Sequence, residues 1–277
     1  MEASFPFSDV LSLLLTFQHK NQTLVILSSD TDVLILFLYY WNELHYQGCS
    51  ELWIKTGSGD SVRYIPIHTL AVQLGREVCQ VLPAVHSLTG CDYTSKFGTK
   101  FAALKAHPEM YLKEFGTKNN FESQVIMAEE YLTSVLKQAT MCKTTDQLRN
   151  YMYHHSKRSC FKNLPPTSYA TKQHIKRAYF ATYHMISVLS KPKWEPLDPT
   201  LYCYEVADDL LVPTDGKHPI PEEFTVICSC TRCGTYHCSC RSNHVPCCSF
   251  CKCESALVVS DATCKNPLGI VWDEECN

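Results

Sequence analysis

The first third of the chain contains short apolar runs and turn residues in a pattern that predicts strands. Residues 23–27 form a short apolar run rich in β-branched side chains, which predicts a buried strand. Residues 52–56 and 62–65 flank the turn sequence GSGD at positions 57–60, and this arrangement predicts a β-hairpin. The N-terminal part is therefore expected to contain a small sheet.

Longer segments with helical spacing follow these strands. Residues 66–74 and 76–88 are predicted as two helices that are interrupted at Gly75. Residues 118–142 and 173–188 are predicted as two further helices. Strands and helices in this order predict an α/β fold followed by a helical middle region.

The overall composition is that of a globular protein. The chain has 277 residues, 45% of them hydrophobic, and its net charge of −3 gives no global indication of a nucleic-acid partner. The longest apolar run, residues 33–41, is shorter than the ~20 residues that span a bilayer. No basic segment precedes the apolar positions of residues 5–17, unlike in a secretory signal. We therefore expect a soluble, intracellular protein without a membrane span.

The charge is unevenly distributed along the chain. Between residues 142 and 193, ten Lys or Arg residues and interleaved aromatic residues accompany a single acid, Asp146. Such a mixture is typical of nucleic-acid surfaces, and the candidate contacts are Lys172, Lys176 and Arg177. The alternative is a helical bundle with solvated cations, in which one helix face is formed by Ile175, Tyr179, Tyr183 and Ile186. The two interpretations are compatible with each other. Residues 195–223 are acidic and contain prolines, which predicts a linker or irregular segment.

Cysteine provides the strongest chemical signal. Of seventeen cysteines, nine are clustered near the C-terminus: Cys228, Cys230, Cys233, Cys238, Cys240, Cys247, Cys248, Cys251 and Cys253. Three C-x-C pairs and a C-x-x-C spacing let several thiolates converge, and zinc takes four such ligands in a tetrahedron. This clustering favours metal over disulfides, because C-x-C pairs form disulfides only with strain.

The number of zinc ions is left open by the sequence. Nine cysteines satisfy three ions if three thiolates bridge, whereas eight ligands fill two separate sites. His237 or His244 could also replace a sulfur. We therefore predict two or three structural zinc ions. In the tail, Cys264 and Cys276 are expected to be free thiols.

The cysteine spacing resembles the tesmin-type CXC module. The matching parts are C-x-C from 228, C-x4-C-x-C from 233, the six-residue gap before 247, and C-x-C from 251. The resemblance implies a small fold with three zinc ions, as found in DNA-binding proteins. The last cysteine of the family pattern, expected near position 256, is Ala256 here, while Cys248 is additional. The module's only cations are Arg232, Arg241 and Lys252, so a protein-binding role stays open.

Carboxylates are the second candidate chemistry. Asp30 and Asp32 follow the first predicted strand, where ligands collect in open α/β folds, and could hold a divalent metal. The alternative is that Asp30 caps the next helix. A third aspartate, Asp92, stands in the sequence GCDY, and Gly-Thr-Lys at 98–100 opens another predicted helix.

The order of strand, D-x-D, hairpin, helix, GCDY, glycine turn and helix over residues 21–108 resembles the second half of the flap-endonuclease branch of PIN-like nucleases. The resemblance implies a partial PIN-like domain in which Mg²⁺ or Mn²⁺ is held by Asp30, Asp32 and Asp92. It also implies that a DNA backbone is gripped by Gly98, Thr99 and Lys100. With the sequence LPPTS at 164–168 and the CXC tail, the chain resembles transposon-associated proteins.

Few further carboxylates are available to complete such a nuclease. Complete nucleases of this kind draw several from an N-terminal half, whereas only Glu2 and Asp9 precede Asp30. The predicted organisation is a PIN-like half-domain, a basic helical region, an acidic linker, a zinc module and a tail, with bounds 1–115, 116–193, 194–227, 228–253 and 254–277. The first hypothesis is a nuclear, transposon-derived, nuclease-like protein that binds nucleic acid but is catalytically incomplete. The alternatives are an active two-metal structure-specific endonuclease and a non-catalytic scaffold whose zinc module binds protein.

Overall fold

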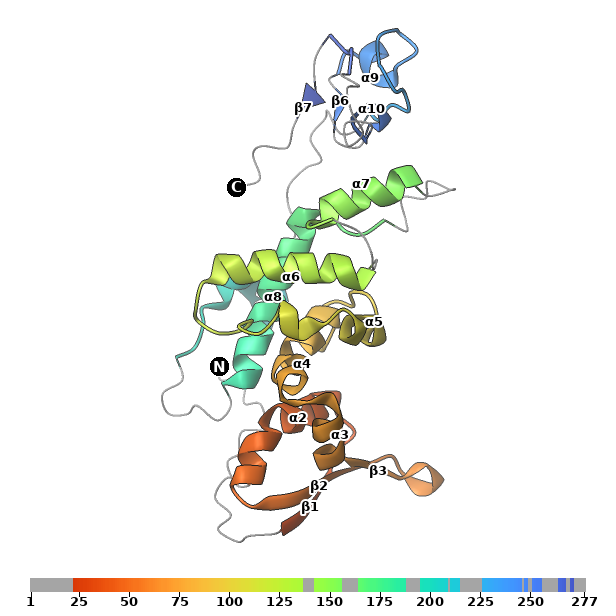
Figure 1. Ribbon diagram of the computed structural model, residues 1–277. Helices are drawn as coiled ribbons and strands as arrows, with labels where there is room; N and C mark the ends of the chain where they lie inside the picture. The colour runs from red at the N-terminus through yellow and green to blue at the C-terminus, as the bar shows by residue number, and fades with distance from the viewer. Residues whose placement is uncertain are drawn as a thin grey trace. The chain divides into compact units, whose positions relative to one another are not determined.

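The chain is a mixed α/β protein with small sheets, as the sequence predicts (Figure 1). The computed structural model describes residues 22–136, 142–155, 164–187, 195–208, 210–214, 226–245, 247–248, 251–255, 264–267 and 270–271. The chain divides into two compact units. Unit 1 comprises Met1–Ala139 and Lys172–Thr214, and unit 2 comprises Thr140–Thr171 and Asp215–Asn277.

Unit 1 contains a three-stranded sheet of order β1-β2-β3. Strand β1 (Gln22–Leu27) pairs in parallel with β2 (Cys49–Thr56), and β2 pairs antiparallel with β3 (Arg63–Pro66). The connection from β2 to β3 passes through Gly57, with a φ of 86° that favours glycine, and the short 3-10 helix η1 (Gly59–Ser61). The predicted strand and the predicted hairpin are therefore confirmed.

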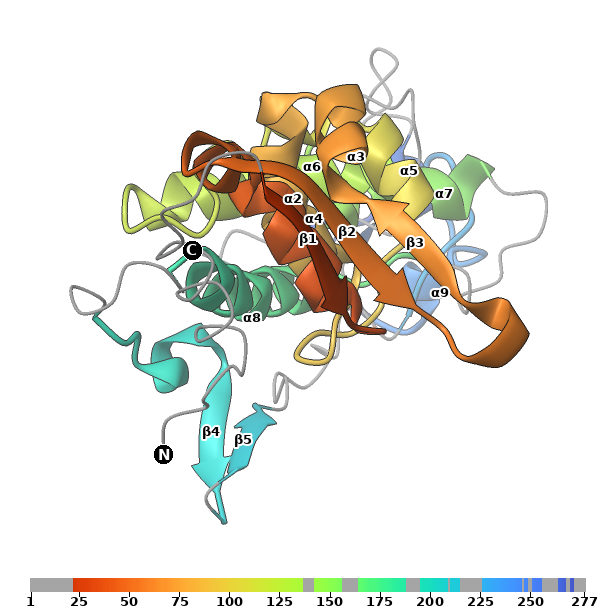
Figure 2. The same ribbon diagram turned by 90° about the horizontal axis from the view of Figure 1, so that it is seen from below.

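Helices cover one face of this sheet. Helix α2 (Thr31–Tyr46) connects the two parallel strands and lies on the same side as α3 (Ile67–Leu74) and α4 (Arg76–Thr89) (Figures 1 and 2). Strand positions that face the helices are apolar, and Ile54 is only 2% exposed. The interruption predicted at Gly75 is confirmed, because this residue has a φ of 79° and separates α3 from α4.

A second apolar cluster in unit 1 lies between α4 and the helices that follow it. It involves α5 (Lys100–Lys105), the 3-10 helix η2 (Pro108–Met110), α6 (Phe121–Leu136) and most of α8 (Ser168–Ile186). Its most buried large side chains include Leu112, Tyr131, Leu132 and Tyr179. The helices predicted in the regions of α6 and α8 are thus confirmed.

Along α8, the aromatic side chains contribute to the core. Tyr179 and Tyr183 are 1% and 7% exposed, and Ile175 is fully buried. The bundle interpretation of this helix is therefore confirmed for its described residues. Its cations lie partly exposed at the surface, namely Lys172, Lys176 and Arg177. The cations at positions 157, 158, 162, 191 and 193 lie outside the described residues.

The acidic stretch predicted as an irregular linker has local structure. It holds the 3-10 helix η5 (Pro199–Tyr202) and an antiparallel hairpin of β4 (Tyr204–Ala207) and β5 (Leu210–Pro213). The Tyr204 hydroxyl donates to the carbonyl of Tyr93 at 3.0 Å, which fastens the hairpin to the loop after α4. The sequence did not indicate this hairpin, because all four positions of β5 are exposed and show no alternation of burial.

Unit 2 consists of short elements apart from one helix. That helix is α7 (Thr145–His155), whose start is held by Ser168, since the backbone N–H of Ser168 donates to the Asp146 carboxylate at 2.9 Å. The remaining elements are α9 (Ser239–Ser242), β6 (Cys247–Cys248), α10 (Lys252–Ser255) and β7 (Ile270–Val271). Among the helices that the structure describes in either unit, none has the length and apolar character to cross a membrane.

Candidate metal centre

The C-terminal part of unit 2 has a buried cluster of cysteine side chains. Its buried cluster consists of seven side chains that are at most 3% exposed: Cys228, Cys233, Cys238, Cys240, Cys247, Cys251 and Cys253. All are free thiols, as is the partly exposed Cys230. The disulfide alternative is therefore not realised among these residues.

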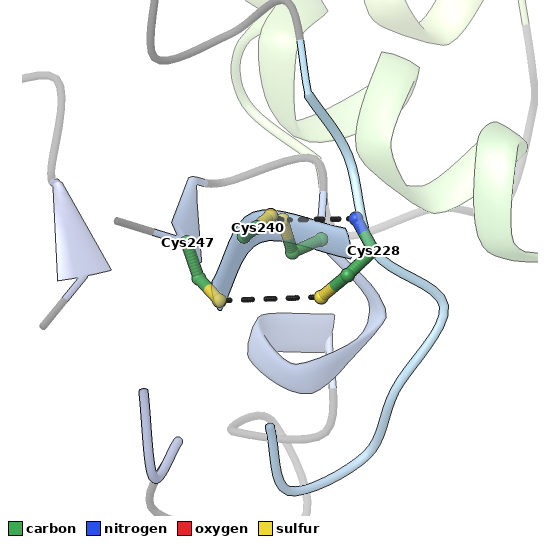
Figure 3. Close-up of side chains that lie close together, drawn as sticks. Cys228, Cys240 and Cys247 are labelled. Atoms are coloured by element: carbon green, nitrogen blue, oxygen red, sulfur yellow. Dashed lines mark hydrogen bonds between the residues drawn. The ribbon is translucent and has the colours of Figure 1, made fainter. Parts of the chain in front are cut away.

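The thiols lie at distances suited to metal binding. Sγ of Cys228 is 3.4 Å from Sγ of Cys233 and 4.0 Å from Sγ of Cys247, and the Cys240 and Cys251 sulfurs are 3.5 Å apart. Figure 3 shows Cys228, Cys240 and Cys247 converging from separate segments. Four sulfurs placed ~2.3 Å from one zinc ion in a tetrahedron are ~3.8 Å apart. The observed spacing is thus that of a zinc–thiolate site.

Three overlapping groups of four thiols have all their sulfurs within 4.8 Å of one another. They are Cys228, Cys240, Cys247 and Cys251; Cys228, Cys233, Cys238 and Cys247; and Cys233, Cys247, Cys253 and Cys264. Within the described part of the chain, His237 and His244 join none of these groups and are exposed. The cluster could therefore hold metal with sulfur ligands alone.

Burial makes the metal-free cluster unfavourable for thiolates. It raises the pKa of Cys228 to about 12, and it also raises the pKa values of Cys233, Cys240 and Cys253. A coordinated divalent ion reverses this effect, because it deprotonates the thiols that bind it. Backbone and side-chain donors already point at the sulfurs: the N–H of Cys228 donates to Cys251 Sγ at 3.5 Å.

One ligand candidate was missed by sequence reasoning. Cys264, expected to be a free thiol, is a free cysteine in the structure, but it lies in the third group of thiols and is therefore a ligand candidate. Its neighbour Asn266 is 5% exposed and donates to Cys247 Sγ at 3.4 Å and to the Val245 carbonyl at 3.0 Å. Residues 264–267 therefore belong to the cluster. Ten residues separate Cys264 from Cys253, so no local spacing could have revealed it.

Two of the predicted thiols are not placed by the structure. For Cys248 the backbone is described in β6, but its side chain lies outside the described part. Cys276 lies outside the described residues altogether. Whether Cys248 or Cys264 binds metal is therefore tested by the zinc content of serine variants.

The aspartates of unit 1 show a different arrangement. Asp30 is the N-cap of α2, and its Oδ1 accepts the backbone N–H of Asp32 at 2.9 Å, which confirms the capping interpretation. Asp32 Oδ1 lies 2.5 Å from Nε2 of His86, a residue of α4 that is only 3% exposed. The other ring nitrogen of His86, Nδ1, lies 2.6 Å from Nζ of Lys100. His86 was not anticipated, because a lone histidine in an apolar helix carries no motif.

Asp92 lies near the other two aspartates without joining them in a metal site. Burial raises the pKa of the Tyr93 hydroxyl, and the charges of Asp32, Asp92 and Asp30 raise it further, so all three carboxylates surround this tyrosine. Among the residues that the structure describes, however, only cysteines form groups of ligand atoms within 4.8 Å. Mg²⁺ requires oxygen ligands at ~2.0–2.1 Å in an octahedron. No three carboxylates of the described residues lie within 4.8 Å of one another in this arrangement.

The residues predicted to contact nucleic acid lie in unit 1. Gly98 has a φ of 66°, and a Cβ there would approach Val135 Cγ1 to 2.8 Å, so the turn before α5 requires glycine. The Thr99 hydroxyl caps α5 by accepting the N–H of Ala102 at 3.2 Å. In α8, Nη1 of Arg177 is buried and has no hydrogen-bond partner among the described residues.

Comparison of the chain with family models, curated proteins and solved structures finds no match.

Proposed function

We propose that this chain is a zinc-containing nucleic-acid-binding protein, in which a CXC-type zinc module accompanies a partial PIN-like, transposon-derived domain. The observation that carries the proposal is the set of three interlocking thiol groups in unit 2. Neighbouring groups share sulfurs, and shared thiolates are what a compact cluster of several zinc ions needs.

The thiol contacts support a specific assignment of ligands to three zinc ions. Burial raises the pKa of the Cys230 thiol, which also interacts with the thiols of Cys238, Cys228 and Cys233 and therefore lies beside them. In this assignment the first ion takes Cys228, Cys240, Cys247 and Cys251, and the third takes Cys233, Cys247, Cys253 and Cys264. The second takes Cys228, Cys233 and Cys238 of the second group, with Cys230 in place of Cys247. Three thiolates bridge in this scheme, namely Cys228, Cys233 and Cys247. Twelve tetrahedral positions are thereby filled by nine cysteines.

The role assigned to zinc is structural. The described part of the cysteine cluster has only a few partly buried apolar side chains packed against it, namely Val226, Ile227 and Val245. Such a small apolar set stabilises a fold weakly, whereas structural zinc contributes its binding free energy directly to folding. Zinc would therefore fix the surface that the module presents to a partner.

Exposed cations of unit 1 support a nucleic-acid partner. Near the turn before α5, Lys96 and Lys105 are exposed, and Phe101 is 70% exposed with Nζ of Lys105 at 4.5 Å from the centre of its ring. Cations beside an exposed aromatic ring suit phosphate contact and base stacking. The buried, unpartnered Nη1 of Arg177 would also be satisfied by an anion.

The test is binding of labelled flap-bearing DNA to the zinc-loaded full-length chain at several salt concentrations. Retention that weakens steeply with salt is expected, because phosphate contacts release counterions. Replacing Lys172 and Lys176 together with Met should reduce the slope of log K against log salt by about 1.8, at about 0.9 per phosphate contact. The matched control is Lys113→Met, which replaces an exposed lysine of the same unit that is not among the predicted nucleic-acid contacts.

Two results would contradict this proposal. Absence of DNA retention by zinc-loaded protein would favour the scaffold whose zinc module binds protein. Cleavage that is lost in Asp30→Asn would establish the endonuclease alternative instead.

A further inference from the structure

We propose that Lys100, held in place by His86, supplies a fixed positive charge beside the aspartates of unit 1, so that this group binds a phosphodiester without Mg²⁺ or Mn²⁺. Asp32, His86 and Lys100 form a hydrogen-bonded series and come from α2, α4 and α5, of which α4 contacts both of the others in unit 1 (Figure 1). The inference rests on the proposed function in one respect: the PIN-like resemblance is the reason to expect a metal ion at these aspartates.

The protonation of this series follows from its donors and acceptors. An ammonium group has three N–H donors and no acceptor, so Lys100 must donate to Nδ1 of His86. The proton of the neutral imidazole is then on Nε2, which donates to Asp32 Oδ1. Every member of the series is satisfied in this state, with a negative charge at one end and a positive charge at the other.

This arrangement occupies part of the donor set that a metal ion would need. Oδ1 of Asp32 accepts from His86, and Oδ1 of Asp30 accepts the N–H that opens α2. Burial lowers the pKa of Lys100, while the negative charge of Asp32 opposes this effect and favours the charged lysine. A divalent cation entering the group would approach the positive charge of Lys100, which repels it.

The same arrangement leaves Lys100 able to bind an anion. His86 takes one of its three N–H donors, and two remain for the oxygens of a phosphate. Lys100 is an exposed residue, while His86, which orients it, is only 3% exposed. A buried histidine thus acts as the positioning residue for a surface lysine.

The experiment measures Mn²⁺ binding to the zinc-loaded full-length chain by the loss of the free-ion electron paramagnetic resonance signal. Zinc-loaded thiolates do not compete, because Mn²⁺ binds more weakly than zinc at such ligands. The wild type is expected to show no saturable Mn²⁺ site in unit 1. Lys100→Met keeps the aliphatic stem but removes the charge, and it should create a site that binds Mn²⁺ about tenfold tighter than the wild type or better.

Controls separate this effect from a general change in surface charge. Lys105→Met removes another exposed cation of α5 and should create no Mn²⁺ site. Adding Asp32→Asn to Lys100→Met should abolish the gained site. If circular dichroism shows that Lys100→Met is unfolded, His86→Gln is used instead. This variant removes the residue that orients Lys100 and should also increase the affinity for Mn²⁺.

Saturable Mn²⁺ binding by the wild type that Asp32→Asn removes would overturn the inference, since the aspartates would then be an ordinary metal site. Failure of both Lys100→Met and His86→Gln to gain Mn²⁺ binding would overturn it as well. Loss of DNA retention is a separate outcome: it would contradict the proposed function and leave the Mn²⁺ result intact.

Discussion

In unit 1 the large buried side chains are apolar, including Ile67 and Tyr131, whereas the buried cluster at residues 228–253 of unit 2 consists of cysteine side chains. The polar group of unit 1 is satisfied internally, since Asp32, His86 and Lys100 pair with one another. In unit 2 the buried thiols lie against one another, and burial raises the pKa of most of them. Unit 1 is therefore expected to fold through the burial of apolar side chains. The cysteine cluster of unit 2 is expected to need bound metal ions in order to fold.

Removal of zinc should produce the largest difference between the units. A strong chelator is expected to unfold the described cysteine region of unit 2, because structural zinc contributes about 10–16 kcal/mol of apparent binding free energy. Unit 1 should keep its fold. Hydrogen exchange on the full-length chain checks this: amides of residues 226–245 should lose protection, while those of α2 and β2 should not.

Truncation of a side chain in the apolar core should destabilise unit 1 and leave the zinc content of unit 2 unchanged. Ile67 is fully buried, so Ile67→Ala should lower the free energy of unfolding of unit 1 by about 2–5 kcal/mol. Ile126→Ala, at a position 63% exposed, is the matched control and should change stability by less than about 0.5 kcal/mol. Chemical denaturation, followed by a spectroscopic signal from unit 1, measures the free energy of unfolding of both variants. Zinc content that fell in Ile67→Ala would show that the two units do not fold independently.

The pH dependence of unit 1 should carry the signature of a buried histidine. Burial lowers the pKa of His184 from its ordinary value of 6.5 to about 4. Between these values the unfolded chain takes up a proton that the folded chain does not, so stability should fall as the pH drops from about 6.5 to about 4. Hydrogen exchange of unit 1 amides across this range measures the fall. In His184→Phe the decline should be shallower, and an unchanged decline would refute the assignment.

The smallest expected effect concerns the cap of α2. Asp30→Ala removes the acceptor for the Asp32 N–H and should destabilise unit 1 by about 1 kcal/mol. Asp30→Asn keeps a capping oxygen while removing the charge, so its loss should be clearly smaller. Equal losses in the two variants, measured by denaturation, would mean that the charge of Asp30 and not its cap contributes to stability.

The sequence was most informative where the chemistry is local. The turn residues between β2 and β3, the break at Gly75 and the ligand spacing from Cys228 to Cys253 all act over a few positions, so they could be read directly. The capping role of Asp30 was one of two readings, and the contact with the Asp32 N–H decides it.

What the sequence could not reveal depends on tertiary contacts. His86 meets Asp32 across 54 positions, and its place in an apolar helix gave no hint of a polar partner. Cys264 returns to the cluster after an interval with no motif. The hairpin of β4 and β5 has exposed strands that lack the usual alternation. The PIN-like and CXC resemblances, and the nucleic-acid partner they imply, stay predictions.

The most direct test of the account is the zinc content of the purified protein and of two serine variants, measured by elemental analysis and native mass spectrometry. The account predicts three zinc ions in the wild type, about one fewer in Cys264→Ser, and no change in Cys248→Ser. A wild type with two ions, or a loss in Cys248→Ser without one in Cys264→Ser, would contradict the proposed cluster.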